Sequence, residues 1–391
     1  MTDGDGTALR RCVGDVDRFR HEHWARRVLL RRRAGSEGFD DLLALADVDE
    51  LLATTLVRRP AFRLVRDGSP LDPKTYTKRI RLGSQVLDDV ADVGRVHTHF
   101  AAGATIVLQG LQRQWPPLTR FCRDVERTLG HPVQANAYVT PAGAQGLGLH
   151  ADAHDVFLLQ VFGSKHWAVW EPDAPAADPG PAALDTELHP GDSLYLPKGA
   201  RHSARTMDTA SIHITVGLLS TTWADLVRTI VERAIGELDL DGPLPLGYVA
   251  DDGFPKELVA RLADLRHHLD EVDTEAAWRA ARARFVAGRT PTLTGGLAAV
   301  IDPPTVGDAT VLVRRRGALA DLVPGPERVS LVLGDRTLRL PAALEPALRL
   351  VLSTPRVSAT DLDGLLEPAS RLVLLRRLVR EGLLEVAPAD Q

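Results

Sequence analysis

The stretch GLGLHADAHDVFLLQ, residues 146–160, holds an H-x-D pair, His150 and Asp152, just before an apolar run. On a β-strand successive side chains alternate between faces, so these two residues would point the same way, with Ala151 opposed. A lone histidine, His202, follows in PGDSLYLPKGARHSA at 190–204, and a neighbouring strand of a barrel could return it to the same place. Two imidazoles and one carboxylate are the facial triad that binds Fe(II) and leaves positions open for a co-substrate and O2.

The residues around this pair strengthen the prediction of a metal site. Taken alone, His150 and Asp152 could be a polar pair at a barrel mouth, and His202 a capped loop histidine. However, the segment GLGLH before the aspartate contains two glycines, which allow its backbone to come close to a ligand. DVFLLQVFGSKHWAVW at 155–170 predicts two strands around a tight turn, and the proline-glycine loop would present His202 at a strand end.

Composition sets the broad class of the protein. The chain has 391 residues, of which 44% are hydrophobic and 25% charged, which predicts a globular protein of two or three domains. The net charge of −5 gives no general bias toward polyanions. Two cysteines, Cys12 and Cys122, lie far apart and favour a reducing compartment. With no apolar leader or membrane-length run, we expect a cytoplasmic protein without a membrane partner.

The pattern of apolar residues predicts a β-rich core preceded by helices. Leucines at helical spacing indicate a helix at 41–56, and a second amphipathic helix at 118–130 ends at Gly130. The arginine run at 26–33 lies in a nearly charge-balanced segment, so a solvated helix face or loop is favoured over a nucleic-acid patch. Short β-branched or aromatic runs separated by Gly and Pro indicate the strands of a barrel or sandwich at 135–141, 155–163, 166–172, 193–197 and 211–220.

The pattern changes after residue 220. Apolar residues at helical spacing predict helices near 223–235, 255–270 and 274–287. The alternating segment 328–341 surrounds a Gly-Asp turn and predicts a β-hairpin, followed by helices near 342–353 and 368–382. Helices combined with a hairpin in so short a segment suggest a winged-helix-like module.

Three motifs together resemble a known family. The segments H-A-D, D-V-F-L-L-Q-V-x-G-x-K-x-W and P-G-D-x-L-Y-L-P-x-G-x-x-H are similar to those of the JmjC-type Fe(II)/2-oxoglutarate oxygenases, especially the ribosomal-oxygenase branch. The resemblance is specific over about 130–220 and looser elsewhere. It implies an α+β protein with a double-stranded β-helix (jelly-roll, cupin-like) JmjC core, a helical dimerisation segment and a C-terminal winged-helix-like domain.

The resemblance also implies roles for individual residues. His150, Asp152 and His202 would be the iron ligands and catalytic centre, and Lys165 would pair with the distal carboxylate of 2-oxoglutarate. A buried dianion needs a fixed cation, which agrees with a lysine there. Three further residues, Asn136, His213 and Thr215, are candidates to face the co-substrate pocket, although each could equally be a satisfied core or strand-edge group. His154 shares the parity of His150 but is left out, because three protein ligands suffice.

The carboxylate of Asp152 bears on the outcome of the reaction. In halogenating relatives of these oxygenases a Gly or Ala at this position leaves room for a halide, so a carboxylate implies hydroxylation. The resemblance therefore predicts an enzyme, an Fe(II)- and 2-oxoglutarate-dependent dioxygenase that uses O2 to hydroxylate a protein side chain, an arginine or histidine of a ribosomal protein. Its expected parts are a catalytic domain at 1–220, a segment at 221–290 that forms a homodimer, and a winged-helix-like domain at 291–391.

Three alternatives remain open from the sequence. The same barrel could hydroxylate a peptide or a small-molecule natural product, because a fold does not fix a function. A non-oxygenase metal cupin is disfavoured, since those barrels usually carry an H-x-H pair and a nearby Glu. A DNA-binding regulator would act through the C-terminal module, but arginines and acidic residues balance over 301–391. A nucleic-acid footprint normally needs a basic face, so we expect no direct nucleic-acid binding.

Overall fold

The structure is a computed structural model that describes residues 6–33, 38–145, 147–172, 180–291, 296–301 and 304–388. The chain divides into two units, Met1–Ser220 and Thr221–Gln391. Among the described helices, none is both long enough and apolar enough to span a bilayer.

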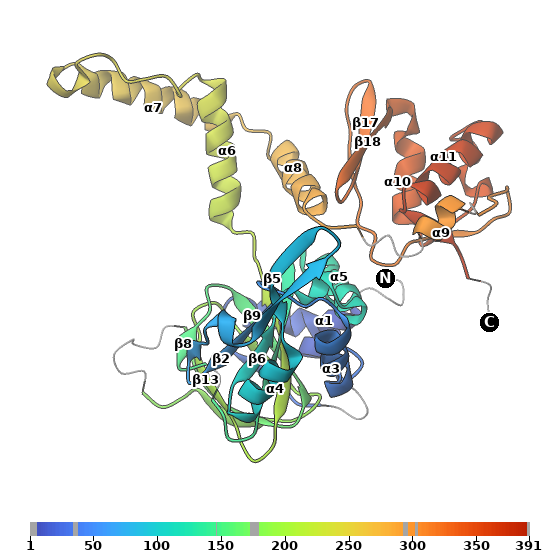
Figure 1. Ribbon diagram of the computed structural model, residues 1–391. Helices are drawn as coiled ribbons and strands as arrows, with labels where there is room; N and C mark the ends of the chain where they lie inside the picture. The colour runs from blue at the N-terminus through green and yellow to red at the C-terminus, as the bar shows by residue number, and fades with distance from the viewer. Residues whose placement is uncertain are drawn as a thin grey trace. The chain divides into compact units, whose positions relative to one another are not determined.

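The first unit is built on two antiparallel sheets (Figure 1). Within the described residues the larger sheet has eight strands, in the order β1-β12-β9-β14-β7-β6-β2-β3. The smaller sheet has four, in the order β11-β10-β13-β8. Strands distant in sequence are therefore neighbours, which is the winding of a jelly roll and confirms the predicted core. The larger sheet consists of β1 (Leu29–Arg31), β2 (Phe62–Arg66), β3 (Ser69–Pro70), β6 (Thr105–Leu108), β7 (Val133–Thr140), β9 (Asp155–Phe162), β12 (Ser193–Leu196) and β14 (Ser211–Leu218).

The two sheets pack face to face at one end of the barrel. The smaller sheet consists of β8 (His150–Ala151), β10 (Lys165–Trp170), β11 (Leu184–Leu188) and β13 (Arg201–Thr206). Apolar side chains from both sheets form one buried cluster, made of Val156, Leu158, Trp167, Val169, Leu188, Leu194, Leu196 and Ala200. This packed end leaves the polar residues of β7, β10 and β14 to line the rest of the interior.

Helices cover the outer face of the larger sheet, where alternate residues of each strand are apolar. The apolar core between the larger sheet and the helices is called the outer core below. On β7, Ala135, Ala137 and Val139 belong to this outer core, whereas Asn136 and Tyr138 point to the opposite face of the sheet. Burial of this face against the helices is the main driving force for the first unit. The helices are α1 (Thr7–Val13), α2 (Val16–Arg18), α3 (Leu45–Thr54), α4 (Val93–Ala101) and α5 (Pro116–Leu129), with short turns of helix at Phe19–His23, Pro73–Thr75 and Leu111–Arg113.

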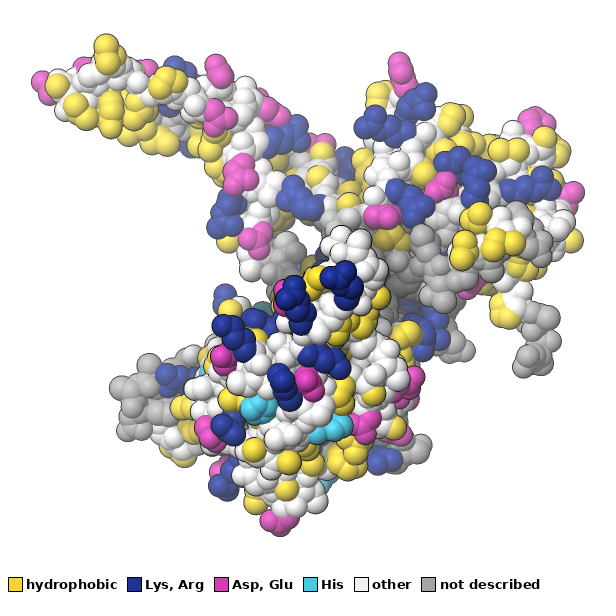
Figure 2. Space-filling model, in the orientation of Figure 1, with side chains coloured by type: hydrophobic (Ala, Val, Ile, Leu, Met, Phe, Trp, Pro, Cys, Tyr) yellow, Lys and Arg dark blue, Asp and Glu magenta, His cyan; other side chains and the backbone are white. Residues whose placement is uncertain are grey.

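A separate hairpin of β4 (Thr77–Leu82) and β5 (Gln85–Ala91) stands outside both sheets. Lys and Arg side chains gather over it in Figure 2. Some of this charge is paired within the unit, because Arg79 contacts Asp88 at 3.1 Å and Arg58 contacts Asp89 at 3.0 Å. Local ion pairs of this kind reduce the net charge that the hairpin presents to a partner.

Two strands of the smaller sheet depart from the sequence prediction. His202 was expected in a loop at a strand end, but it lies within β13, and β11 was not predicted. Both strands are short polar runs, RHSART and LDTEL, without the apolar alternation by which strands are recognised. Their backbones pair with β10 on either side, so the aromatic strand between them supplies the packing that their own side chains lack.

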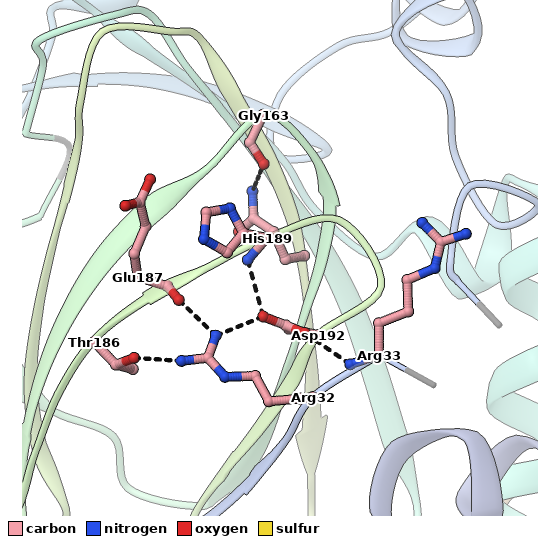
Figure 3. A network of polar contacts seen from close by, with 8 residues as sticks. Arg32, Arg33, Gly163, Thr186, Glu187, His189 and Asp192 are labelled. Carbon is pink, nitrogen blue, oxygen red and sulfur yellow. Dashed lines mark hydrogen bonds and ion pairs between the residues drawn. The ribbon is translucent and has the colours of Figure 1, made fainter. Parts of the chain in front are cut away.

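The arginine run agrees with the prediction only in part, because Arg26 and Arg27 lie exposed in a turn whereas the residues at 31–33 are attached to the barrel. Arg31 ends β1, which pairs with β12 at the edge of the larger sheet. Figure 3 shows the next two residues converging on Asp192. The Arg32 guanidinium donates to Asp192 Oδ2 at 2.7 Å, and the Arg33 backbone N–H donates to Oδ1 at 2.8 Å. The run therefore fastens the N-terminal segment to the jelly roll.

Replacing Asp192 with alanine is expected to lower the free energy of unfolding of the first unit by about 2–3 kcal/mol, because several charge-assisted hydrogen bonds end on one buried carboxylate. Arg32→Ala should lower it by less than about 1 kcal/mol, since the arginine side chain is half exposed. Urea unfolding of the full chain would measure both. Equal losses for the two variants would contradict this ordering.

The second unit begins with three helices, α6 (Trp223–Glu237), α7 (Phe254–Asp270) and α8 (Thr274–Ala287), as the sequence predicted. The first starts with a capping box, in which Thr222 and Asp225 each satisfy the other's backbone N–H. Large apolar side chains remain exposed on α6 and α7, including Trp223 and Val259. Exposed apolar residues on neighbouring helices are typical of a surface that is covered in an assembly.

The rest of the second unit has its own apolar core. The predicted hairpin is present as β17 (Arg328–Leu333) and β18 (Arg336–Pro341), joined through Gly334. The predicted helices are α10 (Glu345–Ser353) and α11 (Pro368–Arg380), both with buried leucines. The relation to a winged helix stays a prediction. The remaining elements are Tyr248–Ala250, α9 (Gly296–Ile301), β15 (Leu312–Arg314), β16 (Asp321–Val323), Ala342–Leu344, β19 (Arg356–Val357), Thr360–Leu362 and β20 (Leu384–Val386).

Candidate active site

The fold brings His150, Asp152 and His202 together. Strand β13 pairs with β8 so that His202 lies directly opposite His150, and Asp152 follows β8 by one residue. One ligand atom from each of the three lies within 4.8 Å of the others, and His202 Nε2 is 3.8 Å from Asp152 Oδ2. This spacing suits three ligands on one face of a metal ion.

Hydrogen bonds to the backbone fix which nitrogen of each imidazole faces the centre of the triad. Nδ1 of His150 is 2.8 Å from the Gly148 carbonyl, and Nδ1 of His202 is 3.0 Å from the Ala200 carbonyl. A carbonyl only accepts, so each Nδ1 carries the hydrogen and each Nε2 keeps its lone pair. Burial lowers the pKa of His202, which favours the neutral form that a metal requires. The donor set therefore fits a divalent metal.

Two backbone N–H groups of the loop before His202 donate hydrogen bonds to the H-x-D segment and to the start of the strand that follows it. Gly199 N–H donates to the Asp152 carbonyl at 3.1 Å, and Lys198 N–H donates to Asp155 Oδ1 at 2.7 Å. Gly199 has a φ of 84°, a conformation that favours glycine. Asp155 also accepts from the buried Tyr195 hydroxyl at 2.7 Å. Asp155 thus holds the loop in place through both of its carboxylate oxygens.

Lys165 lies inside the barrel as a buried cation with no carboxylate partner among the described residues. Its Nζ donates to Thr140 Oγ1 at 3.1 Å, from β10 across to β7. Burial lowers the pKa of Lys165 to about 7. An unpaired buried ammonium is unfavourable by itself, so this position fits an anionic ligand that enters with its own charge.

His213 is close enough to both Lys165 and His202 for their charges to act on it. Its ring stacks on Tyr138 with centroids 4.9 Å apart, and Trp167 meets it edge-on at 5.3 Å. Burial, together with the charges of Lys165 and His202, holds the pKa of His213 well below its usual range. Its Nδ1 is buried and has no hydrogen-bond partner in the part of the chain that the structure describes. A buried, neutral imidazole with a free polar atom could hydrogen-bond to a co-substrate.

Asn136 and Thr215 are cross-strand neighbours on β7 and β14. The Asn136 side-chain oxygen accepts the Gly110 N–H at 3.0 Å, so part of its hydrogen-bonding capacity serves the fold. Thr215 is 9% exposed and points to the barrel interior, as His213 does. Contact of either residue with a co-substrate stays a prediction.

The sequence prediction missed three residues of this site, Thr140, Tyr138 and Trp167. Thr140 and Tyr138 alternate with the outer-core residues of β7, so strand parity with Asn136 could have identified them. Trp167 lies 5.9 Å from the His202 ring, centroid to centroid. His154, by contrast, sits over Gly217, where a Cβ would lie 2.5 Å from its Nε2.

A protein-family model described as a JmjC domain matches residues 108–226, which include the triad, Lys165 and His213. The chain contains a JmjC domain. This match and the jelly-roll winding agree with the family that the sequence motifs resemble.

Proteins similar to this chain include ribosomal oxygenases. Ribosomal oxygenase 1 of Gallus gallus is 28% identical over 56% of this chain and 37% of its own length. Ribosomal oxygenase 2 of Bos taurus is 38% identical over 34% of this chain and 31% of its own length. The bifunctional lysine-specific demethylase and histidyl-hydroxylase NO66 of Dictyostelium discoideum is 28% identical over 56% of this chain and 44% of its length. The chain thus spans less than half the length of these relatives.

Solved structures support the fold of this chain over most of its length. The Escherichia coli ribosomal oxygenase YcfD superposes with a TM-score of 0.55 at 20% identity, covering 96% of this chain and 99% of YcfD. Another YcfD structure, with cobalt and 2-oxoglutarate, gives a TM-score of 0.54 at 20% identity, covering 95% and 98% of the two chains.

Proposed function

We propose that this chain is an Fe(II)- and 2-oxoglutarate-dependent oxygenase that hydroxylates a protein side chain. The observation that carries the proposal is the triad of two imidazole Nε2 lone pairs and one carboxylate, close to a buried lysine without a counter-charge. The names of its relatives and the cobalt and 2-oxoglutarate in the YcfD structure support the same chemistry.

Each residue has a distinct part in this proposal. His150, Asp152 and His202 would hold the iron, and Lys165 with Thr140 would bind the distal carboxylate of 2-oxoglutarate. Together the bound iron and 2-oxoglutarate supply the oxidising chemistry, in which O2 is consumed and 2-oxoglutarate becomes succinate and CO2. His213 would offer a hydrogen bond toward the co-substrate, while Trp167 and Tyr138 exclude water from it.

We propose a ribosomal protein as the substrate, with an arginine or a histidine as the hydroxylated residue. The names of the relatives support this choice, since they include ribosomal oxygenases and a histidyl-hydroxylase. The alternative is a peptide or small-molecule natural product. We keep the proposal that no nucleic acid binds directly, since the basic β4–β5 hairpin is partly neutralised by its own aspartates.

The direct test uses ribosomal proteins extracted from the source cells and incubated with the protein, Fe(II) and 2-oxoglutarate. Mass spectrometry should find one peptide that gains a single oxygen atom, and no gain with the Asp152→Ala variant. If no ribosomal peptide gains oxygen while 2-oxoglutarate is consumed, the substrate is a different one.

We further propose that residues 221–290 form a homodimer. The exposed apolar side chains of α6 and α7 support this, because such residues are usually covered by another surface. Light scattering at micromolar concentration should give twice the mass of one chain. A single-chain mass at that concentration would overturn the dimer.

A further inference from the structure

Arg63 is a charged residue beside the candidate site that neither the metal nor 2-oxoglutarate requires. Arg63 lies on β2 between Phe62 and Leu64, which are both fully buried in the outer core. Side chains alternate along a strand, so Arg63 points to the opposite, inner face. Strand pairing aligns Arg63 with Val107 on β6, and Val107 with Tyr138 on β7. Arg63 thus faces the same interior as the residues around the triad.

The Arg63 guanidinium reaches the phenol of Tyr138. Strands β2 and β7 are two strand spacings apart, about 10 Å, a gap that an arginine and a tyrosine side chain together can bridge. Burial raises the pKa of Tyr138, the charge and hydrogen bond of Arg63 oppose this, and the charge of Asp152 adds to it. One phenol is therefore within range of both Arg63 and a triad carboxylate. The Nε of Arg63 is buried without a hydrogen-bond partner among the described residues.

Arg63 and Lys165 occupy different positions. Lys165 bonds to Thr140 and Arg63 to Tyr138, two residues apart on β7 and about 7 Å along the strand. Lys165 lies on β10 of the smaller sheet, whose last strand, β8, carries His150. Arg63 lies on β2 of the larger sheet, two strands beyond β7. A ligand at Arg63 is thus distinct from the carboxylate at Lys165.

The cationic side chains around the site outnumber the carboxylates. The charged groups acting on Tyr138, His202 and His213 include Arg63 and Lys165, and Asp152 is the one carboxylate among them. Under the proposed function Asp152 serves the metal, and Lys165 is neutralised by the co-substrate. Arg63 is then left as an uncompensated cation, which attracts an anion and repels a guanidinium.

We propose that Arg63 and Tyr138 form a substrate-binding site for the carboxylate of an acidic residue next to the hydroxylated one, and that this site selects a neutral acceptor such as histidine over arginine. The inference rests on the proposed function and narrows its substrate. The glutamate or aspartate would accept hydrogen bonds from the guanidinium, including the Nε–H that now lacks a partner. In a substrate without this acidic neighbour, a cationic acceptor side chain would meet Arg63 with no carboxylate free to compensate it.

The test measures peptide binding to the full chain loaded with Mn(II) and 2-oxoglutarate without oxygen, so that no turnover is needed. Fluorescent peptides carry a central histidine or arginine, flanked by glutamate, glutamine or lysine. We expect the glutamate-flanked histidine peptide to bind at least about tenfold tighter than the lysine-flanked one. The preference should fall below about twofold in Arg63→Gln, reverse in Arg63→Glu and persist in Arg63→Lys.

The matched control is Arg66→Glu, on the same strand but with its side chain donating to the Ala102 carbonyl. It should leave the flanking preference unchanged. Tighter binding of arginine peptides by the wild type, or an unaltered preference in Arg63→Gln, would overturn the proposal. Succinate formation is followed separately in every variant. A chain that forms no succinate but keeps an Arg63-dependent preference would contradict the proposed oxygenase and not the acidic-residue site.

Discussion

Lys165→Met is expected to raise the Kd for 2-oxoglutarate at least about 100-fold while making the protein without co-substrate more stable at neutral pH. Removing one partner of a buried ion pair costs about 3–5 kcal/mol, and each 1.4 kcal/mol is tenfold in affinity. In the absence of 2-oxoglutarate the lysine is buried, and within the described part of the chain its one hydrogen-bond partner is the Thr140 hydroxyl. Methionine is similar in length and has no charge to desolvate.

The pH dependence of the free energy of unfolding tests the effect of Lys165 on stability separately from its effect on the Kd for 2-oxoglutarate. The pKa of Lys165 is about 7 in the folded protein and 10.5 in the unfolded chain. Between these values the unfolded chain binds the proton and the folded chain does not, so stability rises with pH across this window. The rise attributable to Lys165 is at most about 5 kcal/mol, from 1.36 kcal/mol per unit of pKa. Lys165→Met should lack this rise, because it has no group to titrate.

Bound 2-oxoglutarate should have the same effect as the substitution on this pH dependence. A carboxylate beside the ammonium stabilises its charged form, which returns the pKa of Lys165 toward its ordinary value. Urea unfolding of wild type and Lys165→Met between pH 7 and 10, with and without 2-oxoglutarate, would measure both. Parallel stability curves for the two proteins without co-substrate would show that Lys165 is charged, and paired, in the free protein.

The sequence predicted most of what positions the triad. The H-x-D parity, the two strands on either side of the Gly163 turn and a barrel or sandwich class follow from local patterns, because apolar alternation and turn residues act over a few positions. The jelly roll itself was implied by the family resemblance, and β9 and β10 lie in different sheets. The polar strands β11 and β13 were not predicted, because no local pattern marks them. Their place in the sheet depends on pairing with β10, which is a contact between segments distant in sequence.

The same limit applies to the charges of the site. Lys165 was predicted because it belongs to a recognisable motif, while Arg63 belongs to none. Arg63 lies far upstream of the H-x-D segment, and its relation to Tyr138 depends on the order β2-β6-β7. A single sequence does not give the order of strands that pair across long connections. For the same reason, the sequence predicts a solvated helix face or loop for the arginine run and does not indicate the contacts of Arg32 and Arg33 with Asp192.

Asp152→Ala and His202→Ala are each expected to raise the Kd for Mn(II) at least about 100-fold and to reduce succinate formation by a similar factor. Loss of an outer partner of a metal ligand already costs about 10–100-fold, so loss of a ligand should exceed that range. His202 is buried, hence its removal also leaves an apolar-lined gap beside Trp167. Isothermal titration with Mn(II) measures the first effect without requiring turnover.

A second histidine–aspartate pair on the same sheet provides the control. His166 on β10 lies 2.6 Å from Asp185 on β11, yet both side chains are partly exposed and no third ligand joins them among the described residues. Under the triad assignment, His166→Ala and Asp185→Ala leave Mn(II) binding within about twofold of wild type. Their pair is closer than the 3.8 Å between His202 and Asp152, so proximity alone would favour the wrong pair. Tight Mn(II) binding that survives Asp152→Ala and is lost in Asp185→Ala would show that the metal binds at the His166–Asp185 pair and not at the triad.

The triad differs from this pair in the orientation of its two Nε2 lone pairs, which the carbonyls of Gly148 and Ala200 determine.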